Sequence, residues 1–595
     1  MRLNRFISRI RLVLALAVLM AAFSPAASGT SNAPRGASQA ATRASRATQR
    51  AEPSLDAKVD ALFTKWNSLD SPGAAVAVVK DGLVIYRKGF GSAQLEYGIP
   101  ITPSTVFHVA SVSKQFTAMA VTMLEAAGKL SADDDIHKYL PELADFGKTI
   151  TIRHLLNHTS GLRDQWELLI LSGWRMDDVI TQAQIMDRLR RQKELNFAPG
   201  ERYLYCNSGF TLLAEIVSRV SGQPFTDWTR DNIFNPLGMT STHFHLDHQE
   251  IVRNRAYSYN GEPGKGFKQA VLNYANVGAT SLFTTVEDMA NWLRNFDDKR
   301  VGGPSVVDLM LTKGVLNNGQ EIPYARGIEI GEYKGLKTIG HGGGDAGFRS
   351  DVIYFPEEKF GVAVFSNLGS FPPGTLTRQI ADIYLASKLK QPGAVPAGAR
   401  PLPSEPAAQE FSLDAKSLEA FTGTYWFEAT QFLRRVVLDK DRLFYVRSAD
   451  NKSELAPLSP NEFRMKDVPD EVRVSFSGKT GNRYTTVNVT VGTEPPVVGK
   501  WVEPFTPSEK ALKEYAGRYY SDELDTFYDL ILNAGKLRVQ DGHSEDVPLE
   551  PQIRDFFSAG DMASIQFVRD TAGAITGFKV STGRVLNLKF AKLKS

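Results

Sequence analysis

The sequence predicts an α/β domain built on a mainly antiparallel sheet, followed by two small antiparallel β-barrels. Strand-rich hairpins stand at both ends of the first region, and apolar residues recur at helical spacing between them. An internal repeat of short alternating strands indicates the two barrels. Several domains are expected in any case, because a chain of 595 residues is too long for one hydrophobic core.

The N-terminus has the three-part pattern of a secretory signal. Arginines precede the apolar run LVLALAVLMAAF, and the small residues SPAASG follow it. We therefore expect a signal peptide over residues 1–27 and a secreted or periplasmic protein. The run is too short to cross a bilayer comfortably, so no transmembrane segment is expected. Residues 28–53 are rich in Ala, Ser, Thr and Arg without hydrophobic periodicity, which predicts a disordered tether.

The first domain is expected over residues 54–390. It opens with AVAVVK-DG-LVIYR, in which Asp81-Gly82 is a strong hairpin signal, and it closes with a second hairpin, DVIYF-PEEK-FGVAVF. Strands from both ends of a largely helical region imply one sheet. The segment from Ser111 onward should open a buried helix, because apolar residues follow at helical spacing and stop at Gly128: Phe116, Met119, Ala120, Met123 and Leu124.

The C-terminal region contains two copies of one module. Residues 391–409 are rich in Pro, Gly and Ala and predict a linker. The copies at 410–503 and 504–595 should each form a small lipocalin-like barrel with its own core. The repeat is visible in residue pairs at one constant offset: Leu418 and Leu512, Phe421 and Tyr515, Gly423 and Gly517, Tyr425 and Tyr519, Leu443 and Leu537.

The charge balance excludes one class of partner. The net charge is +3, from 69 basic and 66 acidic residues, and no basic stripe with interleaved aromatic residues is present. Nucleic acid is therefore not an expected partner. Cys206 is the single cysteine, so no intrachain disulfide can form. A homodimer is compatible with the sequence, which does not define the oligomeric state.

The stretch HVASVSKQFT contains a candidate nucleophile and base. Residues three apart share one face of a helix, so Ser111 and Lys114 would point the same way while Ser113 points elsewhere. A serine hydroxyl becomes a nucleophile when a base takes its proton, and a buried lysine with a lowered pKa can be that base. The alternative is an ordinary helix start, since S-x-x-K occurs again from Ser387 to Lys390.

Two further segments carry residues that suit such chemistry. PGERYLYCNSGFTLLAEIV places Tyr205 and Asn207 on a loop just before a predicted amphipathic helix. TIGHGGGDAGFRSDVIYF places His341 in a glycine-rich turn immediately before a strand. Each has a structural alternative: a loop tyrosine with a helix-capping asparagine in the first, and a flexible turn with a hydrogen-bonded histidine in the second.

Together these segments resemble the motifs of the serine β-lactamase and penicillin-binding-protein superfamily, in the same order. They are Ser111-Val-Ser-Lys114, Tyr205-Cys-Asn207 and His341-Gly-Gly343, the last standing where many members carry Lys-Thr-Gly. ITIRHLLNHTSGL and PGERYLYCNSGF are similar to the class C-related branch. The resemblance implies a β-lactamase-like first domain, and the two C-terminal barrels most resemble the layout of D-aminopeptidases.

The resemblance implies an acyl-enzyme mechanism without metal or cofactor. Ser111 would attack a carbonyl carbon, and Lys114 and Tyr205 would relay its proton to the leaving group. Asn207 would hold Lys114 and contact the substrate.

The third motif would supply further substrate contacts from His341 and Gly343. By the same resemblance, the backbone N–H groups of Ser111 and Gly344 would form the oxyanion hole. Histidine, with a pKa near 6.5, is mostly neutral at pH 7, so His341 suits a substrate carboxylate less well than a lysine would. The expected function is therefore a D-aminopeptidase, another peptidase or amidase, or an esterase that acts on a small peptide, amide or ester.

Other functions and sites were weighed against this interpretation. β-Lactamase or DD-carboxypeptidase activity stays open, as does a non-hydrolytic protein that binds cell-wall peptide. Residues 243–248 resemble a zinc motif, but a dizinc hydrolase needs histidines downstream that this chain lacks, so no metal is expected. Residues 479–481 spell Lys-Thr-Gly in a predicted hairpin turn, and residues 274–276 imitate the second motif without its Pro-Gly approach or its following helix.

Overall fold

The computed structural model describes most of the chain outside its N-terminus and the region between the first domain and the barrels. The predicted signal peptide, all but the last residue of the predicted tether, and the predicted linker lie outside the described residues. Among the described residues no helix is long and apolar enough to cross a membrane. The described stretches are 53–390, 413–428, 432–448, 451–468, 472–491, 496–540, 546–560 and 563–594.

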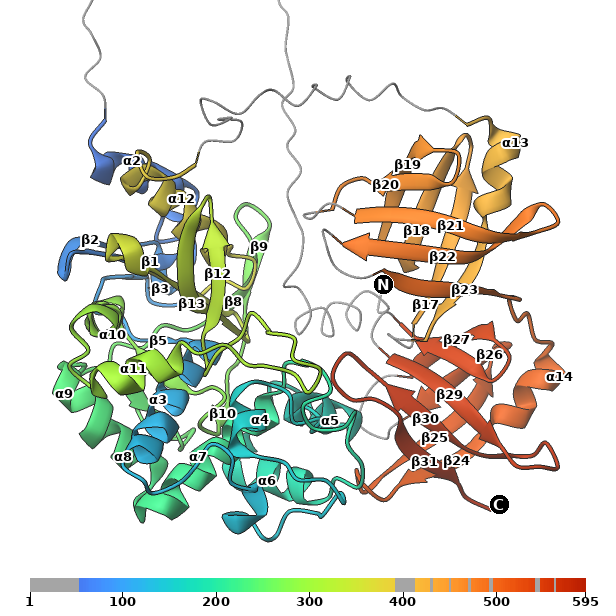
Figure 1. The fold of residues 1–595 in the computed structure, drawn as a ribbon, viewed down its shortest axis with the longest axis horizontal. Coiled ribbons are helices and arrows are strands. Elements are labelled where there is room, and N and C mark those ends of the chain that lie inside the picture. The colour runs from blue at the N-terminus through green and yellow to red at the C-terminus, as the bar shows by residue number, and fades with distance from the viewer. Residues whose placement is uncertain are drawn as a thin grey trace, which may run out of the picture.

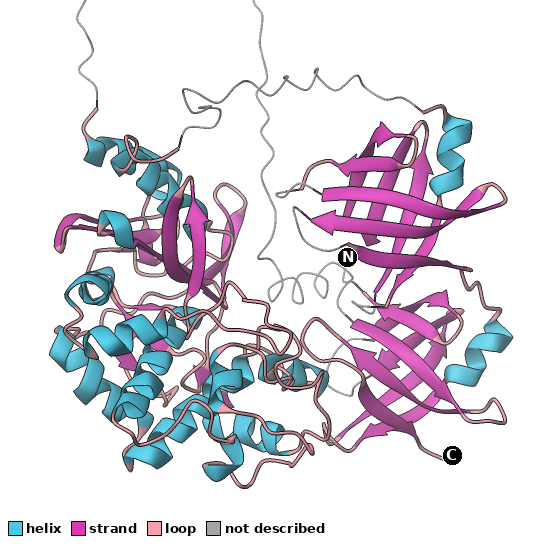
Figure 2. Ribbon diagram, viewed as in Figure 1, coloured by secondary structure: helices cyan, strands magenta, loops and turns pink. Residues whose placement is uncertain are grey.

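The first domain contains a six-stranded sheet in the order β12-β13-β14-β15-β1-β2, with every neighbouring pair antiparallel (Figures 1 and 2). The predicted first hairpin is confirmed, and its turn residues Asp81 and Gly82 have positive φ of 50° and 74°. Pairing of β15 with β1 joins the two ends of the domain, as predicted. The strands are β1 Ala74–Lys80, β2 Leu83–Phe90, β12 Glu329–Tyr333, β13 Leu336–Asp345, β14 Phe348–Phe355 and β15 Phe360–Ser366.

Both faces of this sheet are covered, which explains why β1 is almost wholly apolar. Alternate residues of β1 belong to two different hydrophobic clusters. One cluster includes α2 (Leu55–Phe63) and α12 (Pro373–Tyr384), and the other continues into α10 (Val286–Asp298) and the helical region. The sheet therefore lies between two layers of helix.

The helical region is built around α3 (Ser113–Ala126), which packs on α7 (Asn207–Ser221) and α11 (Gly303–Met310). Most residues of α3 are buried, so the helix runs through the core rather than along the surface. The other helices are α4 Ile152–Leu156, α5 Gln165–Leu171, α6 Gln182–Arg190, α8 Phe225–Thr229 and α9 Asn235–Leu237. The short strands are β3 Ser92–Gln94, β4 Ile99–Pro100, β5 Phe107–His108, β6 Ile180–Thr181, β7 His243–Phe244, β8 Tyr259–Glu262, β9 Gly266–Gln269, β10 Tyr274–Ala275 and β11 Leu282–Thr284.

Two closed eight-stranded antiparallel barrels follow, which confirms the prediction from the repeat. The repeated tyrosines have the same role in both: Tyr425 donates to the Phe421 carbonyl, and Tyr519 donates to the Tyr515 carbonyl. Helices α13 (Ala415–Leu418) and α14 (Glu509–Leu512) stand at equivalent places. The first barrel comprises β16 Gly423–Phe427, β17 Phe432–Asp439, β18 Arg442–Ser448, β19 Asn451–Ser459, β20 Glu462–Met465, β21 Val472–Thr480, β22 Arg483–Val491 and β23 Val497–Val502. The second comprises β24 Gly517–Ser521, β25 Thr526–Asn533, β26 Lys536–Gln540, β27 Val547–Ile553, β28 Phe556–Ala559, β29 Ala563–Arg569, β30 Ile575–Ser581 and β31 Leu588–Lys592.

The two barrels relate differently to the first domain. The core of the first barrel is a separate hydrophobic cluster, whereas that of the second is continuous with the helical region. Tyr528 of the second barrel donates a hydrogen bond of 2.8 Å to the Leu171 carbonyl at the end of α5. Buried Arg163 forms an ion pair with Glu523 at the same junction. The second barrel is thus docked against α5 and its surroundings (Figure 1).

Candidate active site

Ser111 lies in a single 3₁₀ turn, η2 (Ala110–Val112), that leads into α3. The predicted helix is present, but α3 begins two residues after Ser111. Ala110 has φ of 49°, a left-handed conformation that a regular right-handed helix cannot contain. The Ser113 hydroxyl holds this turn by donating to the Ala110 carbonyl at 2.5 Å and accepting from the Leu282 N–H at 3.1 Å. Ser111 therefore sits at a sharp bend with its side chain partly exposed.

Lys114 is the buried partner of Ser111. Its side chain is 0% exposed, and its Nζ donates to Ser111 Oγ at 3.0 Å, to Asn207 Oδ1 at 2.9 Å and to the Ala279 carbonyl at 2.7 Å. Burial is the main cause that lowers the pKa of Lys114 to about 7, although nearby carboxylates act in the opposite direction. A substantial fraction of this amine is therefore neutral at physiological pH.

The three contacts of Lys114 are not equivalent once the amine is neutral. Asn207 Oδ1 and the Ala279 carbonyl can only accept, so the two remaining N–H groups stay on them. The lone pair then faces Ser111 Oγ, whose hydroxyl can donate to it. This is the arrangement that a base needs in order to activate a serine.

Asn207 is held in one orientation by Asp164. The Asp164 Oδ2 accepts from the backbone N–H of Asn207 at 2.7 Å and from its Nδ2 at 2.8 Å. Since a carboxylate can only accept, Oδ1 must be the atom that faces Lys114. Asn207 was expected on the loop before α7, but it is the first residue of that helix, and Cys206 is the capping residue.

Tyr205 completes the group around Ser111. It hydrogen-bonds the Ser111 side chain, and its ring centre lies 5.0 Å from Lys114 Nζ and 4.2 Å from that of His158. Burial raises the pKa of Tyr205 well above its usual range, and the hydrogen bond with Ser111 opposes only part of this effect. Tyr205 is therefore a neutral phenol at pH 7.

His341 lies within strand β13, not in the flexible turn that its glycine neighbours suggested. Its Nδ1–H donates to the Gly342 carbonyl at 2.6 Å, which leaves Nε2 to accept from the Tyr324 hydroxyl at 3.0 Å. Burial and the charge of Lys114 lower the pKa of His341 to about 3. His341 is thus neutral, and its ring lies 6.1 Å from that of Tyr205.

Two of the glycines of β13, Gly340 and Gly343, are required by close approach of neighbouring backbone. A Cβ on Gly343 would lie 2.3 Å from the Val109 carbonyl and 3.1 Å from the Ser111 amide nitrogen. Beyond Gly340, which pairs with Glu329 of β12, strand β13 pairs only with β14 among the described residues. The edge of β13 that faces away from β14 therefore lies beside η2, which contains Ser111. The exposed Gly344 is near the end of this edge.

Two of the alternative motifs in the sequence lie on exposed parts of the chain. Gly481 is an exposed turn between β21 and β22, and Ser387 is exposed beyond α12. The metal-ligating atoms of His243, His245 and Glu250 lie within 4.8 Å of one another, but neighbouring Arg255 bears a positive charge that would repel a metal ion. Tyr274 and Asn276, which imitate the second motif, are both buried: Tyr274 lies in β10, and Asn276 follows that strand.

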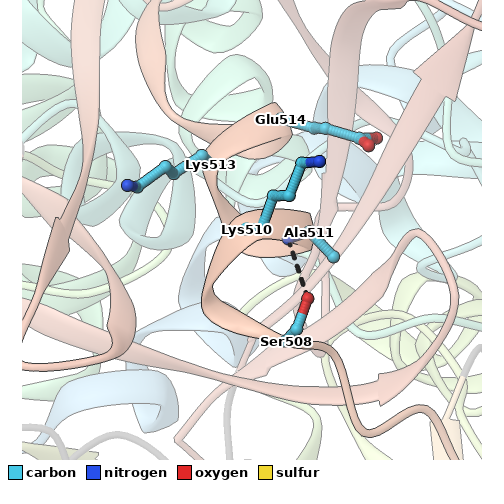
Figure 3. Close-up of a pocket in the computed structure, with 5 residues that line it drawn as sticks. All are labelled: Ser508, Lys510, Ala511, Lys513 and Glu514. Atoms are coloured by element: carbon cyan, nitrogen blue, oxygen red, sulfur yellow. Dashed lines mark hydrogen bonds between the residues drawn. The ribbon is translucent and has the colours of Figure 1, made fainter.

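A surface hollow of the second barrel is also unrelated to the reacting groups. It is lined by α14 and its flanks: Ser508, Lys510, Ala511, Lys513 and Glu514 (Figure 3). Ser508 accepts from the Ala511 N–H at 3.3 Å, as the cap of a short helix does. Its lysines and glutamate are arranged around a solvated surface and include none of the predicted site residues.

The fold and the serine–lysine pair define a hydrolase of the β-lactamase class. The chain belongs to the Beta-lactamase family, whose model matches residues 55–385. It is related to D-aminopeptidases: that of Brucella anthropi is 32% identical over 297 residues, which cover 50% of this chain and 56% of the relative. That of Gluconobacter oxydans is 31% identical over 314 residues, which cover 53% of this chain and 58% of the relative. The chain thus spans little more than half the length of these relatives.

A solved structure extends the likeness beyond the first domain. The octameric penicillin-binding protein homologue from Pyrococcus abyssi has a TM-score of 0.50 at 25% sequence identity. The match covers 72% of this chain and 96% of that one.

Four residues around the site were not singled out in the sequence. Asp164 orients Asn207, His158 packs on Tyr205, and Tyr324 hydrogen-bonds His341. His158 belongs to the segment ITIRHLLNHTSGL, which resembles the class C-related branch, whereas Asp164 lies two residues beyond its end. The fourth, Arg584, comes from the second barrel, and no pattern in its own hairpin distinguishes it from a turn arginine.

Proposed function

We propose that the protein hydrolyses an amide or ester bond of a small substrate through an acyl-enzyme on Ser111. The observation that carries this proposal is the 3.0 Å contact between Ser111 Oγ and the wholly buried Lys114, whose pKa is about 7. A base with a pKa near the working pH combines the correct protonation state with enough basicity to accept the serine proton.

Acylation would form the bond between Ser111 Oγ and the carbonyl carbon and break the bond from that carbon to the leaving nitrogen or oxygen. The serine proton would move to Lys114, while Tyr205 passes its proton to the leaving group and is reprotonated from Lys114. The N–H groups of Ser111 and Gly344 would bind the developing oxyanion. Water would then attack the acyl carbon with the same groups in reversed roles, which releases the acid and restores Ser111.

The similarity to D-aminopeptidases supports a short peptide or amide of a D-amino acid as the substrate. Neutral His341 supports a substrate that carries no anion at that place. Ester cleavage would follow from the same steps, since an alcohol leaves more readily than an amine. The secretory pattern at residues 1–27 supports action outside the cytoplasm.

Covalent labelling with a fluorophosphonate tests this proposal. Ser111→Ala should lose the label and reduce kcat/KM by at least about a thousandfold, because the nucleophile is removed. Ser387→Ala is the matched control, since Ser387 belongs to the other S-x-x-K and is exposed. Mass mapping that finds an unchanged label in Ser111→Ala would refute the assignment. D- and L-amino-acid p-nitroanilides, tested beside short-chain aryl esters, would then identify the accepted acyl group.

A further inference from the structure

The second barrel delivers a loop to the active site. Residues 582–587 connect β30 to β31, and Glu167 of α5 accepts from the backbone N–H of Arg584 at 2.6 Å and from the Thr582 hydroxyl. The Arg584 carbonyl accepts from Asn196 Nδ2 at 2.9 Å and from the Asp164 N–H at 3.3 Å. The backbone of Arg584 is therefore held on both sides by the catalytic domain.

The side chain of Arg584 lies on the catalytic tyrosine. Its guanidinium carbon is 5.0 Å from the centre of the Tyr205 ring, which is within cation–π range. Asp164 Oδ2 stands 3.9 Å from Nη1, but that oxygen already accepts two hydrogen bonds from Asn207. Within the described parts of the chain the guanidinium donates no hydrogen bond, and the side chain is 30% exposed. Its N–H groups are therefore accessible to a ligand.

The other charged groups around Ser111 are neutral or at least partly engaged. Lys114 is committed to the serine, and His341 carries no charge near pH 7. At the end of β13, Asp345 accepts hydrogen bonds from two side chains, and Arg349 donates to two backbone carbonyls. Arg349 uses only its Nη1 for these bonds, so Arg349 and Arg584 both keep donors for a substrate, and Arg584 is the one that lies on Tyr205.

We propose that Arg584 binds a carboxylate on the leaving group of the substrate, such as the C-terminal carboxylate of a short peptide. This role presupposes the acyl-enzyme mechanism proposed above, in which Tyr205 passes a proton to the leaving group. Because Arg584 lies on the Tyr205 ring, its N–H groups would be near the leaving group that receives the Tyr205 proton. His341 leaves the third motif uncharged, so the cation that selects an anionic substrate comes from another domain.

Two thioesters of one accepted acyl group isolate this interaction: the thioglycolate, with a carboxylate on the leaving group, and its neutral primary amide. They differ in charge at one place, and any difference in intrinsic reactivity cancels when the ratio of their rates is compared between variants. A charge-assisted hydrogen bond is worth about 1.5–3 kcal/mol, so Arg584→Gln should lower the ratio of kcat/KM for carboxylate over amide by about tenfold to a hundredfold. Arg584→Lys should retain part of the preference, since it keeps the charge but loses the planar fork.

Lys589→Gln is the matched control, because Lys589 is a cation of the adjacent strand β31 that pairs with Glu194 away from Tyr205. It should leave the ratio unchanged. Each variant is first labelled with the fluorophosphonate, so that a folded active site is established independently of substrate charge. An Arg584→Gln protein that labels normally and keeps the parental ratio would overturn the carboxylate subsite. Absence of label on Ser111 in the parent protein would instead overturn the proposed function.

Discussion

At the residue scale, burial gives Lys114 and Tyr205 opposite roles in proton transfer. Both are buried, and burial disfavours the charged form of each. For an amine this lowers the pKa, to about 7 in Lys114, and for a phenol it raises the pKa. At neutral pH the lysine can therefore accept a proton, whereas the tyrosine can donate one. The sequence indicated that both residues take part, but it could not assign these separate roles.

The pKa of Lys114 predicts how kcat/KM falls at low pH. The neutral amine is the active form, so kcat/KM on an uncharged ester should rise with pH and reach half of its plateau near pH 7. The positive charge of Arg584 is one of the causes that lower the pKa of Lys114, so Arg584→Gln should move the midpoint to higher pH. A profile of kcat/KM from pH 5 to 10 measures both. A rate that is independent of pH over that range would contradict the assignment of Lys114 as the base.

The neutral ring of His341 predicts that a lysine at this position would change the substrate preference. In His341→Lys, a fixed positive charge would replace a neutral ring beside Tyr205. The ratio of kcat/KM for nitrocefin, which carries a carboxylate, over an uncharged ester should rise by about tenfold. His341→Gln is the neutral control and should not raise this ratio. Equal losses on both substrates in His341→Lys would show that the histidine serves in positioning instead.

At the scale of elements, local signals predicted the hairpins but not the glycine strand. The turn at Asp81-Gly82 needs positive φ at two successive residues. Asp-Gly favours this conformation, so two residues of sequence are enough to predict the turn. Strand β13 depends on contacts with η2 and β14, so its glycines resembled a flexible turn when read alone. The same holds for η2, where the left-handed Ala110 has no residue-type signature. Tertiary contacts, not local preference, decide both elements.

The glycines of β13 provide an internally controlled test of this contact. In Gly343→Ala the new Cβ would meet the Val109 carbonyl at 2.3 Å, so η2 or β13 must shift. Displacement of the nucleophile by about an ångström can cost on the order of a hundredfold in rate, and we expect a loss of kcat of that size. Gly342→Ala should be nearly silent, because its Cβ would meet only ordinary contacts at 3.6 Å and beyond. Comparable losses in both variants would argue against a specific contact between β13 and η2.

At the scale of the whole molecule, the repeat predicted two barrels but not their different placement. Alternating strands and repeated aromatic residues indicate that each repeat forms a closed barrel. Docking depends instead on loops and scattered polar residues, such as Arg163 and Glu523, which lie far apart in sequence. Neither has a periodicity that would mark it as an interface residue. The sequence therefore left the role of the C-terminal repeats open, whereas the structure places Arg584 of the second barrel against Tyr205.

The buried ion pair at this junction predicts a stability effect. Arg163 and Glu523 side chains are 1% and 7% exposed, so Glu523→Ala would remove the closest carboxylate from a buried guanidinium and leave it only Glu194, at 4.0 Å. Removal of one partner of a buried pair costs about 3–5 kcal/mol, which should lower the urea midpoint of the transition that reports on barrel docking. Lys193→Ala, which removes an exposed ion pair with Asp522 across the same junction, should leave that midpoint unchanged. Equal midpoints for Glu523→Ala and the parent protein would show that the pair contributes nothing to docking.

The loop from the second barrel also has a consequence for the order in which activity is acquired during synthesis. Ser111, Lys114, Tyr205 and His341 leave the ribosome long before Arg584, which arrives only with the last strand connection of the second barrel. A chain that stops within this barrel would still carry its nucleophile and base but would lack the arginine. Such a truncated product would accept leaving groups without regard to their charge. Under the proposed role of Arg584, completion of the second barrel would convert a general acylating serine into a selective one.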